Sequence, residues 1–177
     1  MTYPTPVKPV LLRFDGSEHA AEAIAVAGRL LGPRPAVLLT VCEPTRIWSP
    51  SDPATILDAP IGKMLAKALE FDEIAEAVAQ DQVDRGVELA HAAGFRAEGR
   101  IAHGKAWHAI CDVADRLDAA AVVPGARGLS RVQSALLGSV SMAVSMHAGS
   151  PVLIVHHPAE QTAPVEANRQ RAVVPEP

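Results

Sequence analysis

The sequence has few aromatic residues, few cysteines and no excess of basic charge. Phe, Trp and Tyr make up 3% of its 177 residues, too few for the stacking platforms that bind single-stranded nucleic acid. The net charge of -4 lacks the basic excess of a general nucleic-acid binder. Two cysteines are too few for a disulfide framework, which favours a cytoplasmic protein. From the few aromatic residues and the charge we expect that it does not bind nucleic acid.

Long hydrophobic runs are also missing. No stretch approaches the roughly 20 consecutive apolar residues that a membrane-spanning helix needs. The first residues, MTYPTPVKPV, contain no apolar segment of the kind found in signal peptides. We therefore expect neither a membrane protein nor a secreted one. Apolar residues still make up 49% of the chain, which suffices for a domain with a sizeable core.

The two ends of the chain differ in composition from the part between them. Prolines cluster in the first residues, and the last twenty residues contain four prolines and no apolar periodicity. We therefore expect a flexible N-terminus over residues 1–8, one folded domain over 9–157 and a disordered C-terminal tail over 158–177.

Within the expected domain, apolar runs typical of buried strands alternate with helical patterns. The expected strands cover residues 10–14, 36–41, 95–103, 119–123 and 151–155. Helices are expected after Ser17 and over 61–93, 107–117 and 139–147, with a proline-rich loop over 42–60. Strands that are apolar on both faces and separated by helices are typical of a covered parallel sheet. The sequence therefore predicts an α/β three-layer sandwich with helices on both faces of the sheet.

A loop that contains glycines follows the expected fourth strand. Gly125 and Gly128 have no side chain that would keep an anion away from the backbone. Gly138 and Ser139 stand where the next helix begins, and the free N–H groups and dipole of a helix start attract phosphate. The position of this loop, after a strand and before a helix, predicts a phosphate-binding site.

Side chains near this loop are further candidates. Ser139 and Ser141 offer hydroxyl donors, or are plain helix caps, and Arg127 is either a phosphate ligand or a solvated surface charge. Asp15 ends the first expected strand, at the edge of a parallel sheet where ligands bind. Its carboxylate either binds a ligand or caps the turn before the first helix.

No catalytic residue and no metal site are predicted. The sequence shows no nucleophile next to an assignable base. His156 and His157 are neighbours in sequence, and neighbouring strand residues point to opposite faces, so the pair is poorly placed to chelate one ion. Cys42 is interpreted as a small buried or loop residue, with a redox role as the less favoured alternative.

The spacing G-x2-G-x9-G-[ST], carried by Gly125, Gly128, Gly138 and Ser139, resembles the nucleotide loop of the universal stress protein family. The segments VLLRFDGSEHAAEAIAVA, VVPGARG, GSVSMAV and AGSPVLIV are similar to the family as well, and the resemblance covers residues 9–157. It implies a five-stranded parallel sheet in the order 3-2-1-4-5, of the adenine-nucleotide α-hydrolase-like kind. It also implies a homodimer through the last strand, residues 151–155.

By this resemblance the ligand is ATP, with Mg²⁺ or Mn²⁺ bridging its phosphates. The residues implied for the adenosine end are Asp15 and the backbone of Val41. Those implied for the ribose and phosphates are Gly125, Arg127 and Gly128, and for the β- and γ-phosphates Gly138, Ser139, Val140 and Ser141. In the order 3-2-1-4-5 the ends of the first and fourth strands lie on either side of one crevice.

Three positions depart from the family's pattern. Arg13 and Phe14 precede Asp15 where small residues are more common, and Phe14 either belongs to the core or crowds the adenine. Pro124 stands where methionine is common. Phe14 and Pro124 are therefore weaker site candidates, and they bear on nucleotide choice more than on the fold.

The resulting prediction is a nucleotide-dependent stress or regulatory module that binds ATP, hydrolyses it slowly at most and acts on an unknown protein partner. An interaction scaffold of the same fold without a nucleotide and a binder of AMP or cyclic AMP are the alternatives. The segment 138–141 favours a triphosphate over the scaffold. The missing base and nucleophile disfavour an efficient hydrolase.

Overall fold

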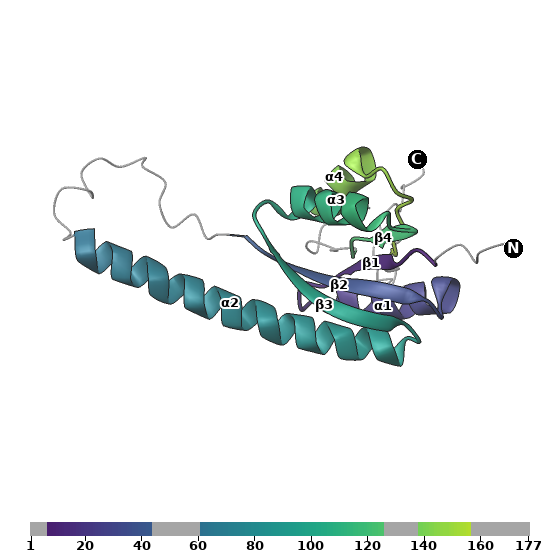
Figure 1. Cartoon of the computed structure of the whole chain (residues 1–177), viewed down its shortest axis with the longest axis horizontal. Helices are drawn as coiled ribbons and strands as arrows, with labels where there is room; N and C mark the ends of the chain where they lie inside the picture. Colours follow the sequence, from purple (N-terminus) through teal and green to yellow (C-terminus); the bar gives the residue numbers. More distant parts are fainter. Residues whose placement is uncertain (1–6, 44–60, 126–137, 157–177) are drawn as a thin grey trace, which may run out of the picture.

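Strands and helices alternate along the chain, as Figure 1 shows. The computed structural model describes residues 7–43, 61–125 and 138–156, and of residues 61–71 it describes the backbone only. The strands are β1 (Val10–Arg13), β2 (Pro35–Cys42), β3 (Arg96–His103) and β4 (Ala121–Val123). The helices are α1 (Glu18–Leu31), α2 (Ile61–Ala92), α3 (Ala106–Leu117) and α4 (Ser139–His147). The expected tail over 158–177 and most of the expected flexible N-terminus lie outside the described residues.

The four strands form one parallel sheet in the order β3-β2-β1-β4. The predicted fifth strand over 151–155 is wrong. Val152 forms a single parallel bridge with Val122, flanked by one hydrogen bond to the Pro151 carbonyl and one from the Leu153 N–H. Pro151 has no N–H to donate to a ladder, and the pairing stays confined to the bridge at Val152, although β4 forms a three-residue ladder with β1 on its other edge. The segment lies beside β4 without becoming a strand of the sheet.

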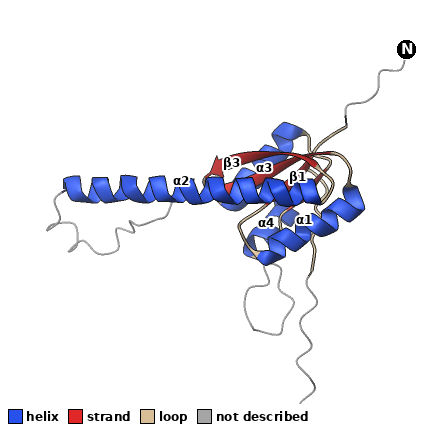
Figure 2. Ribbon diagram, turned by 90° about the horizontal axis from the view of Figure 1, so that it is seen from below, coloured by secondary structure: helices blue, strands red, loops and turns tan. Residues whose placement is uncertain are grey.

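The sheet separates two layers of helices, as predicted. In Figures 1 and 2 α1 and α2 cover one face of the sheet, and α3 and α4 cover the other. Side chains that alternate along each strand supply a core on each face, because neighbouring strand residues point in opposite directions. The strand residues buried toward α1 and α2 include Val10, Leu12, Ala36 and Leu38, and those buried toward α3 and α4 include Leu11, Val37, Leu39 and Val122.

The sequence signals for the helix ends are confirmed. The Ser17 hydroxyl accepts a hydrogen bond from the Ala20 N–H at 3.2 Å and caps α1. Gly94 follows the end of α2 with a φ of 92°, a left-handed conformation that favours glycine. These two signals set helix ends within one or two residues of the expected positions.

Helix α2 is longer than the sheet that it covers. It has 32 residues, or about 48 Å, and Figure 2 shows its N-terminal part extending past the strands. Its buried side chains, at Ala79, Val83 and Ala90, all lie in the part that covers the sheet. Among the described residues, no helix is both long and apolar enough to cross a membrane.

Candidate functional site

A cavity of about 460 Å³ opens at the carboxyl ends of β1 and β2, where the helices α3 and α4 begin. It is lined by Arg13, Asp15, Val41, Glu43, Gln82, Ala106, Gly138, Ser139, Val140 and Ser141. The predicted site residues Asp15, Val41 and 138–141 are therefore brought together, although they come from three distant parts of the sequence. This is the edge at which a parallel sheet places its ligands.

The remaining predicted residues lie elsewhere or outside the described part of the chain. Gly125 is buried next to the cavity, with a φ of 72° that suits glycine. Arg127 and Gly128 lie outside the described residues. Phe14 is fully buried in the core under α1 and α2, and Pro124 is buried without lining the cavity. Phe14 thus adopts the core role rather than crowding the cavity.

The two helices that begin at the cavity differ in how their first N–H groups are used. At the start of α3, the Ala106 N–H donates to the Glu43 carboxylate at 2.9 Å. At the start of α4, Gly138 is the N-cap and, within the described ranges, no side chain accepts a capping hydrogen bond. An acidic side chain thus already meets the positive end of α3, whereas the positive end of α4 lines the cavity and meets no acidic side chain among the described residues, which leaves it suited to an anion.

The two serines of α4 play different parts. Ser141 is buried, and its hydroxyl donates to the Gly125 carbonyl at 2.5 Å. A hydroxyl has one proton to donate, so in this arrangement Ser141 supports the backbone of the loop. Ser139 is exposed at the first position of the helix. Its hydroxyl is the serine donor better placed to meet a ligand in the cavity.

Asp15 organises the end of β1 and the start of α1. Its carboxylate accepts hydrogen bonds from the Ser17 N–H at 3.2 Å and from the Ser17 hydroxyl at 2.6 Å. It also pairs with Arg13, with 3.0 Å between Nη1 and Oδ2. The turn-capping role is therefore present, and the same carboxylate lines the cavity.

Arg13 is the principal cavity residue that sequence reasoning missed. It ends β1, is 8% exposed and lines the cavity beside its ionic partner Asp15. A buried guanidinium is costly unless charged and polar neighbours compensate it. The signal in the sequence is an arginine at the end of an otherwise apolar strand, two residues before a predicted ligand residue.

Glu43 and Gln82 also line the cavity and were not predicted. The Gln82 side-chain amide donates to the Asp15 carbonyl at 3.4 Å, and it reaches the cavity from α2. Sequence patterns do not give the position of a long crossover helix along the sheet. Glu43 directly follows β2, so the rule that pointed to Asp15 at the end of the first strand could have found it.

Cys42 adjoins the cavity residues Val41 and Glu43, and its chemistry bears on the redox alternative. Burial raises the pKa of the Cys42 thiol, and the negative charges of Glu76 and Asp72 raise it further. A thiol with a raised pKa is protonated at neutral pH and is a poor nucleophile. The free cysteine is therefore unlike a reactive redox cysteine.

Comparison with known proteins settles the family. The model of the universal stress protein family matches residues 6–156. The chain belongs to the universal stress protein family. A universal stress protein of Thermus aquaticus is 34% identical over 150 residues, covering 84% of this chain and 98% of its own. YxiE, a universal stress protein of Bacillus subtilis (strain 168), is 29% identical over 150 residues, covering 82% of this chain and 97% of its own.

Solved structures of universal stress proteins share the fold. A universal stress protein in complex with cAMP is 25% identical, with a TM-score of 0.55 over 86% of this chain and 98% of that one. An Arabidopsis thaliana family member with AMP bound is 19% identical, with a TM-score of 0.58 over 90% of this chain and 97% of that one. These similarities confirm the α/β architecture of a parallel sheet covered by helices.

Proposed function

We propose that this universal stress protein binds an adenine nucleotide in the cavity at the carboxyl ends of β1 and β2. The phosphates would lie at the start of α4, and the adenosine would lie toward Asp15 and Val41. The observation that carries the proposal is the contrast between the capped start of α3 and the available start of α4. The nucleotide complexes of the fold's solved members add support, above all the 25% identical protein in complex with cAMP.

The size and lining of the cavity suit this ligand. A volume of about 460 Å³ falls within the range of roughly 300–1,000 Å³ that is typical of small-molecule sites. The backbone N–H groups at Ser139 and Val140 and the Ser139 hydroxyl suit phosphate oxygens. Arg13 lines the cavity and contributes a positive charge, and its guanidinium is ion-paired with Asp15. Gly125 would belong to the phosphate region, and by the family resemblance Arg127 and Gly128, which lie outside the described residues, would belong to it as well.

Within this class of ligand we propose ATP with Mg²⁺ or Mn²⁺. These cations prefer oxygen ligands and take one or two carboxylates together with the phosphates of a nucleotide. The oxygen donor that the cavity offers to such an ion at the phosphate end is the Ser139 hydroxyl. The segment 138–141 supplies the helix start for the terminal phosphates, which favours a triphosphate over AMP or cyclic AMP.

The nucleotide would act as a regulatory ligand. A ligand stabilises whichever conformation or partner surface it binds better, and its removal reverses the effect. The cavity lacks a nucleophile paired with a base among the described residues, which fits slow hydrolysis at most. We further propose a cytoplasmic homodimer that meets along residues 151–155 beside β4, and a protein partner that distinguishes the loaded from the empty state.

Calorimetric titration of the purified protein with Mg-ATP, AMP and cyclic AMP tests this proposal. Binding of one nucleotide per chain, tightest for Mg-ATP, is the expected result. Tighter binding of AMP or cyclic AMP would support the cavity as a nucleotide site but would contradict ATP as its ligand. If none of the three binds, the interaction scaffold without a nucleotide becomes the better explanation of the fold.

A further inference from the structure

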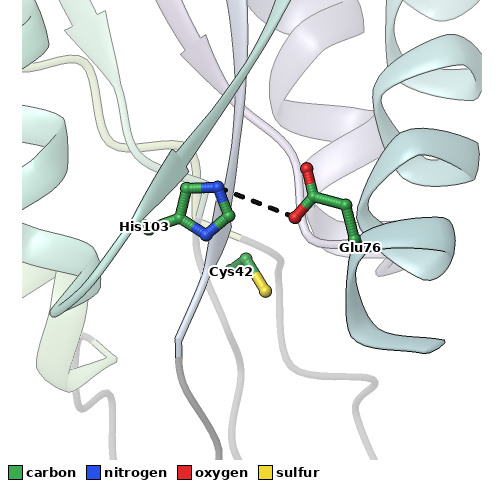
Figure 3. A group of neighbouring side chains, drawn as sticks. All are labelled: Cys42, Glu76 and His103. Carbon is green, nitrogen blue, oxygen red and sulfur yellow. Dashed lines mark ion pairs between the residues drawn. The ribbon is translucent and has the colours of Figure 1, made fainter. Parts of the chain in front are cut away.

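Three metal-ligating side chains meet outside the nucleotide cavity, at the carboxyl ends of β2 and β3. They are Cys42, Glu76 and His103, and Figure 3 shows the His103 ring and the Glu76 carboxylate facing one another with Cys42 beside them. We propose that these three residues bind a divalent cation of the zinc class. This site is distinct from the ion expected to accompany nucleotide phosphates, and it does not depend on the proposed nucleotide function.

The backbone brings two of the ligands together. Cys42 and His103 are partners in the parallel register of β2 and β3, so their side chains leave the same face of the sheet. That face is the one covered by α2, because Leu38, four residues before Cys42, is buried in the core toward α1 and α2. Val41 points to the opposite face, where it packs against the core toward α3 and α4. The ligands are thus supplied by rigid elements rather than by a loop.

The third ligand comes from the helix that crosses this face. Glu76 of α2 places its Oε2 atom 3.6 Å from Nε2 of His103. The ligand atoms of all three residues lie within 4.8 Å of one another. Metal–ligand bonds of about 2.1 Å in a tetrahedron put neighbouring ligand atoms about 3.4 Å apart. The histidine and glutamate atoms, 3.6 Å apart, already have nearly that separation, and because no separation exceeds 4.8 Å, the sulfur has at most about 1.4 Å to move.

The side chains can make this small adjustment. His103 and Glu76 are 64% and 51% exposed, so neither is fixed by close packing. Rotation of these two long side chains toward Cys42 needs no movement of the sheet. The His103–Glu76 ion pair alone would explain two of the three positions. It does not explain why a sulfur ligand lies beside the pair.

The donor set indicates the kind of ion. A thiolate, an imidazole and a carboxylate together suit zinc and similar transition metals, whereas Mg²⁺ and Ca²⁺ require oxygen ligands. Three protein ligands leave the fourth tetrahedral position open to water or another group. Asp72 lies one helical turn before Glu76, and its negative charge acts on Cys42. The Asp72 charge therefore makes the proposed site more attractive to a cation.

Binding involves no change of oxidation state. The Cys42 thiol releases its proton to solvent as the sulfur–metal bond forms, and His103 coordinates through the lone pair of its neutral ring. Glu76 coordinates as the carboxylate that it already is. The ion would join α2 to the ends of β2 and β3, directly behind the strand end that carries Val41 and Glu43.

Titration with Co²⁺ in the absence of nucleotide tests the proposal, because cobalt bound to a thiolate absorbs in the near ultraviolet. The full chain is used without a histidine tag. We expect one Co²⁺ per chain with this absorption and its displacement by Zn²⁺. Cys42→Ser should abolish the absorption, and the matched variant Cys111→Ala, which removes the other cysteine, should retain it. His103→Gln and Glu76→Gln should weaken binding by at least the 10–100-fold that loss of an outer partner costs.

Because His103 and Glu76 are exposed, their variants distinguish a loss of metal binding from a loss of folding. Replacing His103 or Glu76 removes no buried contact, so these variants should keep the melting temperature of the metal-free protein. The proposal is overturned if the wild type binds no stoichiometric Co²⁺. It is also overturned if the absorption survives Cys42→Ser, or if His103→Gln and Glu76→Gln bind as tightly as the wild type. None of these results bears on nucleotide binding at the other face of the strands.

Discussion

The sheet has a cavity at each end, and the two cavities differ in chemistry more than in size. The cavity at the amino ends of the strands measures about 550 Å³ and the one at the carboxyl ends about 460 Å³. The larger is bordered by Leu117 and His91, near the C-terminal ends of α3 and α2. The smaller is bordered by Ala106 and Gly138, at the starts of α3 and α4.

This difference follows from the parallel topology. Each helix runs back along the sheet, so helix starts collect at the carboxyl ends of the strands and helix ends collect at the amino ends. Backbone dipoles therefore make the smaller cavity attractive to anions and the larger one unattractive to them. The buried Arg13–Asp15 pair reinforces the polarity of the smaller cavity. The direction of the helices, rather than cavity volume, identifies the candidate site.

The largest expected effect is on stability, from Arg13→Met. This change removes one partner of the buried Arg13–Asp15 ion pair, which typically costs about 3–5 kcal/mol of unfolding free energy. Arg96→Met, at the edge of the larger cavity, should cost under about 0.5 kcal/mol because Arg96 is exposed. Urea unfolding of both variants measures the difference. Equal losses would mean that the two ends do not differ in buried charge.

The next largest effect is on ligand binding, from Gly138→Val. A branched side chain at the start of α4 would hold phosphate away from the helix, so we expect nucleotide affinity to fall roughly 100-fold, about 2.7 kcal/mol. Calorimetry with Mg-ATP measures this loss, with Arg96→Ala as the control at the other cavity. A full loss in the control variant, or none in Gly138→Val, would contradict the assignment.

A smaller effect separates the two serines of α4. Ser139→Ala removes an exposed hydroxyl that faces the cavity, so affinity should fall by roughly 3–10-fold, as for one hydrogen bond. Ser141→Ala removes the hydrogen bond to the Gly125 carbonyl, so it should lower stability by about 1 kcal/mol. Affinity and melting temperature are measured for both variants. The reverse pattern would show that Ser141, not Ser139, is the donor to the ligand.

The smallest effect is expected at the larger cavity. Glu98→Gln breaks an exposed ion pair with Arg100, which contributes about 1 kcal/mol at most. Nucleotide affinity should stay within about twofold of the wild type, because the helices that border this cavity, α2 and α3, end there rather than begin. A tenfold loss of Mg-ATP affinity in this variant would place the ligand at the amino ends after all.

Much of the fold could be predicted because it depends on local patterns. Strands such as Pro35–Cys42 are apolar on both faces, and Ser17 and Gly94 mark helix ends by their own backbone preferences. The strand order came from the family resemblance rather than from any local pattern. The prediction of a fifth strand over 151–155 was wrong because this segment pairs with β4 at Val152 alone, and the extent of pairing with a distant strand is not contained in the segment's own sequence.

The candidate site divides in the same way. Asp15 and Gly138 were found because they stand at the end of a strand and the start of a helix. Arg13 and Gln82 were missed because their roles depend on burial and on how α2 lies across the sheet. Predicting that Cys42 and His103 lie side by side requires only the register of two neighbouring strands. Predicting that Glu76 joins them also requires the rotation of the 32-residue helix α2 about its axis.

The most direct measurement is a titration of isotopically labelled protein with Mg-ATP, followed by the amide signals in NMR spectra. We predict the largest shifts at the N–H groups of Ser139 and Val140, which start α4 at the smaller cavity. Signals of Arg96 and Glu98, at the larger cavity, should stay in place. Shifts confined to Arg96 and Glu98, or no shifts at saturating Mg-ATP, would contradict nucleotide binding at the carboxyl ends of the strands.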